Sequence, residues 1–333
     1  MSLRIVFSLC FFILLIFGNA QSPLKMKVGY YVRSLKINNK EKNAVIDLYY
    51  WYRFKLPEDT SDLSSYYALE VTNGDLLFNE IQEERVTGKN LDSFYVSGHM
   101  KGQFNFDADY KYYPFDKQKL KIEIEHPVYA TDEVILIPDQ ESYNKCHIAA
   151  HKWGLSKDLH TDGLFANRSG FETNPRVYET DFGDPDIKET SSSYSKLTYY
   201  ISVSRDYLPY TLKFMLPLMI ILSLAYLVFY IPAEALDLAA GLTVTSLLAG
   251  IAFQWTISDD LPEVGYLTCV DRIFYLSYVL ISIAMIQTIW TYHLELNKNF
   301  RLSNILEIGG RWLFPILFFG GSAYFILSAI HST

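Results

Sequence analysis

Two carboxylates bound a regularly spaced row of residues in an otherwise apolar segment. The row recurs at steps of three or four residues, so at about 100° per residue it falls within an arc of roughly 80° on one helix face. Ionisable residues at membrane depth are costly and by default indicate function. Repeated around an axis, this face would line a water-filled passage, and each carboxylate would become a cation-attracting ring. Its members are Asp237, Gly241, Thr245, Leu248, Ala252, Trp255 and Asp259.

No basic side chain accompanies these carboxylates, because the chain has no Lys, Arg or His between Lys213 and Arg272. Two interpretations of the acids stay open. Asp237 at one mouth, and Asp259 and Asp260 at the other, either select cations or only cap the helix and face solvent. Trp255 either narrows the outer passage or packs against a neighbouring helix.

The N-terminus predicts a secretory signal over residues 1–20. Arg4 gives the basic start, Val6 to Phe17 the apolar run and Gly18-Asn19-Ala20 the small-residue cleavage site. The alternative is a permanent membrane anchor, but the apolar run is short for a full span. If the signal is removed, the region that follows is exported.

Composition divides the remaining chain into two domains. Residues 21–206 are mixed and polar with alternating patterns, whereas residues 207–333 are mostly apolar, although hydrophobic residues make up 50% of the whole. A net charge of −8 argues against binding nucleic acid and suits a protein that concentrates cations. Of three cysteines, Cys146 and Cys269 fall in different domains, and no metal-ligand spacing occurs, so we expect no disulfide, metal or cofactor.

Alternating or aromatic-rich runs separated by turn signals predict a β-sandwich over residues 21–206, of the immunoglobulin-like kind. The predicted strands are 28–35, 45–54, 93–99, 120–125, 134–137, 170–180 and 197–204.

Four apolar segments then follow, each near the ~20 residues that a transmembrane helix needs. They lie at about 208–230, 236–257, 267–292 and 309–331, with a short linker predicted from about 293 to 310. That linker lies on the cytoplasmic side if the β-domain is exported. Lys298 and Arg301 within it, and Arg311 directly after it, agree with the positive-inside tendency.

Five short motifs, in this order along the chain, resemble those of the pentameric ligand-gated ion channels, or Cys-loop receptors, in their prokaryotic form. The resemblance covers essentially all of the mature chain. The motifs are Asp109 with Tyr113-Pro114-Phe115-Asp116, Ser204-Arg205-Asp206-Tyr207, Phe214-Met215-Leu216-Pro217, Ala249-Gly250-Ile251-Ala252-Phe253-Gln254 with Leu261-Pro262, and Arg311-Trp312-Leu313-Phe314-Pro315.

Departures from the family pattern are also visible. The two bridging cysteines of the family would fall at Phe106 and Leu120, so the disulfide is absent, as in prokaryotic members. The large intracellular domain of animal receptors is absent as well. Tyr67-Ala68-Leu69 stands where relatives have a Trp-x-Pro stretch. The residues of the family's ligand pocket are therefore poorly transferable to positions of this sequence.

The resemblance implies roles for residues at the junction of the two domains. Arg205 and Asp116 would form a buried pair that couples them, with Asp109 and Pro262 nearby, and the loop 261–266 would receive the push of the 113–116 and 38–42 loops. The resemblance makes Leu248 the hydrophobic gate, which stops ions by dewetting.

A ligand site between subunits, lined by aromatics, is also implied. Tyr194 and Tyr129 would form one wall, while Tyr49, Trp51 and Arg53 share a strand face and would form the other. Arg53 there would favour an anionic ligand. With 26 tyrosines in the chain, chance placement of aromatics is common.

We therefore expect a homopentamer around a central pore in a bacterial inner membrane, with its β-domain on the periplasmic side. It would be a cation channel opened by a small-molecule agonist or by protons, with lipid around it. The alternative is a non-conducting, membrane-anchored binding module, which would need no acid-bounded helix face. A transporter would show broken spans and repeats, and a hydrolase a nucleophile–base pair; the sequence has neither.

Overall fold

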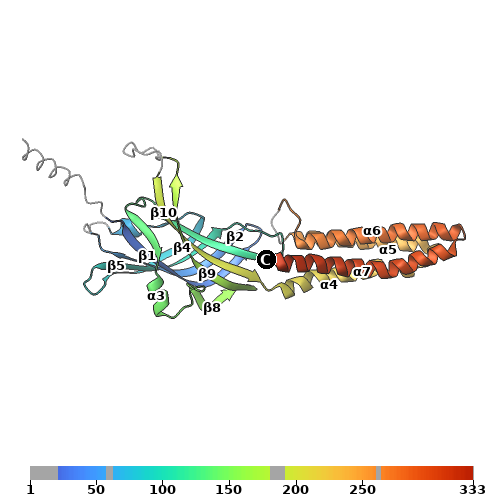
Figure 1. The fold of residues 1–333 in the computed structure, drawn as a ribbon, viewed down its shortest axis with the longest axis horizontal. Coiled ribbons are helices and arrows are strands. Elements are labelled where there is room, and N and C mark those ends of the chain that lie inside the picture. Colours follow the sequence, from blue (N-terminus) through green and yellow to red (C-terminus); the bar gives the residue numbers. More distant parts are fainter. Residues whose placement is uncertain (1–21, 58–62, 181–191, 260–263, 333) are drawn as a thin grey trace, which may run out of the picture.

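The computed structural model describes residues 22–57, 63–180, 192–259 and 264–332 of the 333-residue chain. The predicted signal segment 1–20 lies outside the described residues. Figure 1 shows an elongated molecule, with the strands gathered at one end and the long helices side by side at the other. The C-terminus lies at the junction between the two parts.

The strands form two sheets packed face to face. One sheet has the order β4-β5-β2-β1-β7, with β8 also paired to β1, and the other has the order β3-β6-β10-β9. Most neighbours are antiparallel, while β7 and β8 run parallel to β1. The strands are β1 (Leu24–Asn38), β2 (Asn43–Lys55), β3 (Glu70–Val71), β4 (Gly74–Thr87), β5 (Ser93–Asn105), β6 (Lys117–Glu125), β7 (Val134–Pro138), β8 (Leu155–Thr161), β9 (Leu164–Tyr178) and β10 (Ser192–Arg205).

Strand alternation builds the sandwich core. In β2 the even-numbered residues from Ala44 to Phe54 are buried, and the odd-numbered residues from Val45 to Arg53 are half-buried on the outer face. Large aromatic side chains such as Tyr30, Phe104 and Tyr199 fill the space between the sheets. Two short helices, α2 (Ser64–Tyr67) and α3 (Gln140–Lys145), lie in the connections.

Among the described residues, four helices are long and apolar enough to cross a membrane. They are α4 (Tyr207–Tyr226), which continues as the 3₁₀ turn η1 (Leu227–Tyr230), α5 (Leu236–Ser258) after the turn η2 (Ala233–Ala235), α6 (Cys269–Leu296) and α7 (Phe300–Ser332). The predicted fold class, a β-sandwich followed by four membrane helices, is confirmed.

The structure corrects two details of the sequence prediction. Strands β3, β4 and β8 were not predicted, and β4 shows why, since nearly all of its residues are exposed and its sequence therefore lacks alternation. The fourth membrane helix begins at Phe300 and not near 309, leaving only residues 297–299 as a turn. Its first turns carry polar residues, including the Glu307–Arg311 ion pair of 3.2 Å, so apolarity alone placed the start too late.

Candidate functional site

The row bounded by Asp237 and Asp259 lies on one side of α5, and its own chain leaves that side uncovered. All seven residues are exposed, with Leu248 62% and Trp255 73% accessible. The opposite side is buried where α5 packs against α4 and α6, and its buried residues are Ala239, Thr243, Ser246 and Gly250. The helix therefore has a covered apolar back and an uncovered face with acids at both ends.

The acids at the two mouths are available to solvent. Asp237 lies in the first turn of α5 and Glu234 in the turn before it, and both are exposed. No side-chain hydrogen bond caps α5, and within the described residues the Asp237 carboxylate has no hydrogen-bond or ion-pair partner. Asp259 is the exposed residue that ends the helix. Asp260 and Pro262 lie outside the described residues.

Arg205 and Asp116 form a buried ion pair where the sandwich meets the helices. The Arg205 Nε donates to the Asp116 Oδ1 at 3.1 Å, and the two side chains are 4% and 2% exposed. A second guanidinium nitrogen donates to the Asn39 Oδ1 at 2.7 Å, and the guanidinium lies over the Tyr113 ring at 5.1 Å. The Arg205 side chain thus connects β10 to the loops that hold Asp116 and Asn39, and both loops lie next to the membrane helices.

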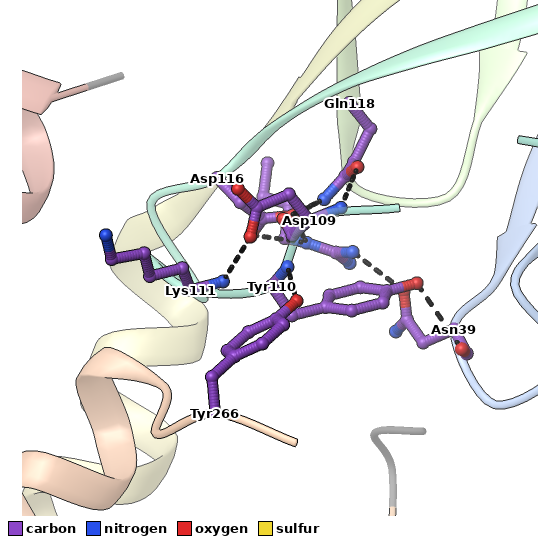
Figure 2. Close-up of polar contacts among 8 residues, drawn as sticks. Asn39, Asp109, Tyr110, Lys111, Asp116, Gln118 and Tyr266 are labelled. Carbon is purple, nitrogen blue, oxygen red and sulfur yellow. Dashed lines mark hydrogen bonds and ion pairs between the residues drawn. The ribbon is translucent and has the colours of Figure 1, made fainter. Parts of the chain in front are cut away.

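Gln118 connects Asp116 to Asp109, as Figure 2 shows. Its Nε2 donates to the Asp116 carboxylate and to the Asp109 carbonyl, while its Oε1 accepts from the Asp109 backbone N–H. The Asp109 carboxylate accepts from the Lys111 backbone N–H at 2.9 Å and so shapes the start of the loop. Asp109 therefore supports the Arg205 pair through Gln118.

The same loop contacts the connection between α5 and α6. The Tyr110 backbone N–H donates to the Tyr266 hydroxyl at 2.9 Å, and the Tyr110 hydroxyl donates to the Asn39 carbonyl at 3.3 Å (Figure 2). Burial raises the pKa of Tyr110 to about 12, which keeps that hydroxyl protonated. Tyr110, Tyr113 and Phe115 also pack into the apolar cluster of the membrane helices. The sequence prediction named the loops but missed Tyr110, Tyr266, Asn39 and Gln118.

Tyr194 and Tyr129, the candidates for one wall of a ligand site, lie in the same part of the sandwich. Tyr194 of β10 contacts the Tyr178 ring of β9 at 5.8 Å. Tyr129 stacks on Tyr66 at 4.9 Å and lies within hydrogen-bond distance, 3.2 Å, of the Ser65 hydroxyl. Both aromatics are half-buried.

Tyr49, Trp51 and Arg53, the candidates for the other wall, lie on β2 of the other sheet. The Trp51 indole N–H donates to Asp139 at 2.9 Å. The Arg53 guanidinium donates to both Asp139 and Glu141 at 2.9 Å, so its charge is already paired. The expectation that Arg53 favours an anionic ligand stays a prediction, although two carboxylates already pair with its guanidinium. Asp139 directly follows strand β7, but an acid there is common enough that the pairing could not be anticipated.

His126, beside Tyr129, is held in one neutral form by its surroundings. Its side chain is buried, its Nε2–H donates to the Ser65 carbonyl at 2.9 Å, and its Nδ1 accepts from the backbone N–H groups of Val128 and Tyr129. A proton on Nδ1 would point at these two backbone N–H donors, which disfavours the protonated ring. Burial is the main cause that lowers the pKa of His126.

Comparisons with known proteins agree with this architecture, although no family model matches the chain. It is 25% identical over 211 residues, 63% of its length, to a proton-gated ion channel of Gloeobacter violaceus. It is 26% identical over 284 residues, 80% of its length, to the acetylcholine receptor subunit beta-like 1 of Drosophila melanogaster. A pH-sensitive chloride channel 2 of the same fly is 20% identical over 206 residues, 60% of the chain.

The chain spans about half or less of the length of these relatives, with 53%, 50% and 36% of them covered. The acetylcholine receptor match covers enough of the chain that it must include parts of both the sandwich and the membrane helices. Together with the four apolar helices, these matches support a likeness of the chain to pentameric ligand-gated ion channels.

The buried pair at the junction gives a first prediction. Replacing Arg205 by Gln leaves the Asp116 carboxylate buried without a counter-charge, so we expect a loss of about 3–5 kcal/mol of stability. The matched control is Arg33→Gln, because Arg33 is 51% exposed and lies 4.0 Å from Asp47, a surface pair worth about 0–1 kcal/mol. Thermal unfolding of the detergent-purified protein measures both.

The exchange of the two residues, Arg205→Asp with Asp116→Arg, should recover part of that loss. The other side chains bonded to this pair within the described residues, Asn39 and Gln118, are neutral and can serve either arrangement. Equal destabilisation by Arg205→Gln and Arg33→Gln would show that the junction does not depend on the buried charge.

His126 gives a prediction about pH. Its pKa is lower in the folded protein than the ~6.5 of an exposed histidine, so the unfolded chain binds the extra proton. The stability contributed by neutral His126 is complete above that value and is lost as the pH falls from about 6.5 toward the folded pKa. We expect His126→Gln to flatten the fall of the melting temperature between pH 7.5 and 5. The exposed His151, replaced by Gln, is the control, and identical pH profiles for all three proteins would contradict the assignment.

Proposed function

We propose that the chain is one subunit of a homopentameric, cation-selective channel whose pore is lined by five copies of α5. The observation that carries this proposal is the uncovered face of α5, which holds seven exposed residues while the back of the helix is buried. In lipid, a face with acids at both ends would be costly. Around a shared axis it faces water and the cost disappears.

Cation selectivity is proposed from the residues themselves, because the matched relatives include a protein named as a chloride channel. Asp237 and Glu234 are exposed near the start of α5, and Asp259 is exposed at its end. With no Lys, Arg or His between Lys213 and Arg272, no side chain in this segment offsets their negative potential. Rings of carboxylates at both mouths would concentrate cations and repel anions.

We assign the gate to Leu248, with Trp255 as a second constriction two turns further along α5. Both side chains lie on the uncovered face, and their exposure, 62% and 73%, is large for apolar residues. A ring of such side chains can block ions by dewetting.

Opening would be driven by a ligand or by protons acting on the sandwich. The aromatic groups around Tyr194 and Tyr129 belong to a different face from Tyr49 and Trp51, as expected if two neighbouring subunits build one site. Motion would reach α5 through the loops that Arg205 joins and through the contact between Tyr110 and Tyr266. The sandwich would lie outside the membrane, on the periplasmic side of a bacterial inner membrane, with lipid around α7.

Reversal potentials in a planar bilayer test both conduction and selectivity. In a gradient of potassium chloride, the purified wild-type protein should show a reversal potential near that of potassium. Asp237→Lys should abolish or invert this preference, because it places five positive charges at the narrow inner mouth. The control is Asp132→Lys, which makes the same charge change at an exposed position of the sandwich.

Two results would overturn the assignment. A protein that assembles but carries no current at any pH, even after Leu248→Ser has replaced the apolar gate by a hydroxyl ring, would remove the channel function. A current whose reversal potential is the same in wild type and Asp237→Lys would leave the channel but remove Asp237 from the selectivity filter.

A further inference from the structure

A chain of polar side chains ties the outer half of α5 to α6. The Tyr278 hydroxyl lies 3.0 Å from the Gly250 carbonyl and 2.9 Å from the Gln254 Oε1, and donates toward them. The Gln254 Nε2 donates to the Asp271 Oδ1 at 2.9 Å. The Asp271 Oδ2 accepts from the Thr268 backbone N–H and hydroxyl, which closes the capping box at the start of α6.

Each side chain in this series forms a hydrogen bond to the next one, so the link between α5 and α6 is specific. Asp271 uses one carboxylate oxygen to cap its own helix and the other to hold α5 through Gln254. The helices also approach closely here, because a Cβ at Gly250 would lie 3.0 Å from the Tyr278 ring. A larger residue at 250 would separate the two ends of the link.

The link pulls on the side of α5 that is opposite its uncovered face. At about 100° per residue, Gln254 lies roughly 40° from the buried Gly250 and about 140° from the middle of the row that contains Leu248. The pull toward α6 therefore draws the outer end of α5 away from the side that carries Leu248 and Trp255. Without this link, the outer end of α5 is free to move in the direction in which Leu248 and Trp255 point.

We propose that Gln254 is a positioning residue that, through Asp271 and Tyr278, holds the outer end of α5 away from the pore axis and favours the conducting arrangement. This inference rests on the proposed pore. Loss of one hydrogen bond between membrane helices typically changes an equilibrium constant by a factor of about three. Because all five subunits of a homopentamer lose the same bond, we expect Gln254→Leu to lower the open-to-closed ratio by at least about tenfold.

The link is tested most directly by a distance that needs no agonist. A nitroxide label on Thr256→Cys, in a Cys146→Ser background, reports the separation of neighbouring α5 helices by pulsed electron resonance. Thr256 is exposed, and among the described residues its hydroxyl bonds only to the Ala252 carbonyl of its own helix. With Gln254→Leu added, the distances should shorten by about 2 Å, the usual scale of a helix shift.

Exchanging the two partners separates positioning from general packing. In the double variant Gln254→Glu with Asp271→Asn, the Asn amide can donate to the Glu carboxylate, and its oxygen can still cap Thr268. The wild-type distances should therefore return, although the charge has moved to α5. Tyr278→Phe should shorten them partly. Tyr275→Phe is the matched control, because within the described residues the Tyr275 hydroxyl has no hydrogen-bond partner.

Each outcome decides the proposal. Shortened distances in Gln254→Leu and recovery in the exchange would establish the link, and single-channel recording should then show a lower open-to-closed ratio with an unchanged unitary current. Unchanged distances in Gln254→Leu, or failure of the exchange to restore them in an assembled pentamer, would overturn it. Absence of current at every pH, even in a Leu248→Ser background, would instead reject the proposed channel, whatever the distances.

Discussion

The structure depends on one constraint, namely that α5 crosses the apolar bundle with a face that its own chain leaves uncovered. Small side chains at Gly241, Thr245 and Ala252 line this face, and Asp237 and Asp259 place a carboxylate at each end of it. On the buried side, the hydroxyls of Thr243 and Ser246 donate to carbonyls of their own helix. Such a face is unstable against lipid. In the proposed channel, several copies associate around water and so satisfy this face, and the remaining elements position α5 for that role.

The junction explains how a sandwich without a disulfide holds such a helix. Arg205 gathers Asp116 and Asn39 at the point where β10 ends, and the loop around Tyr110 is buried among the membrane helices. Tyr266 joins that loop to the connection before α6, whose first turn holds α5 through Asp271 and Gln254. Hydrogen bonds, together with the short chain segment from Tyr266 to Asp271, thus connect the last strand to the C-terminal end of α5.

The sequence was informative where a pattern repeats. The helical period located the uncovered face of α5, and strand alternation with apolar run lengths gave the fold class. It failed where a contact joins distant positions without a period, as between Tyr110 and Tyr266 or Arg53 and Asp139. Sequence-based prediction also failed for β4, because both faces of this strand are exposed and the alternation of polar and apolar residues is therefore missing. Arg205 and Asp116 were paired by resemblance to a family, because nothing local connects two residues 89 positions apart.

Cysteine accessibility along α5 tests the central claim most directly. In a background with Cys146 and Cys269 replaced by Ser, single cysteines would be introduced at each position from 237 to 259 and exposed in liposomes to a charged, membrane-impermeant thiol reagent. Cysteines at 237, 241, 245, 248, 252, 255 and 259 should react, and modification should change the current, whereas those at 239, 243, 246 and 250 should not react. Equal reaction on both sides of the helix, or protection of the uncovered face, would contradict a pore lined by α5.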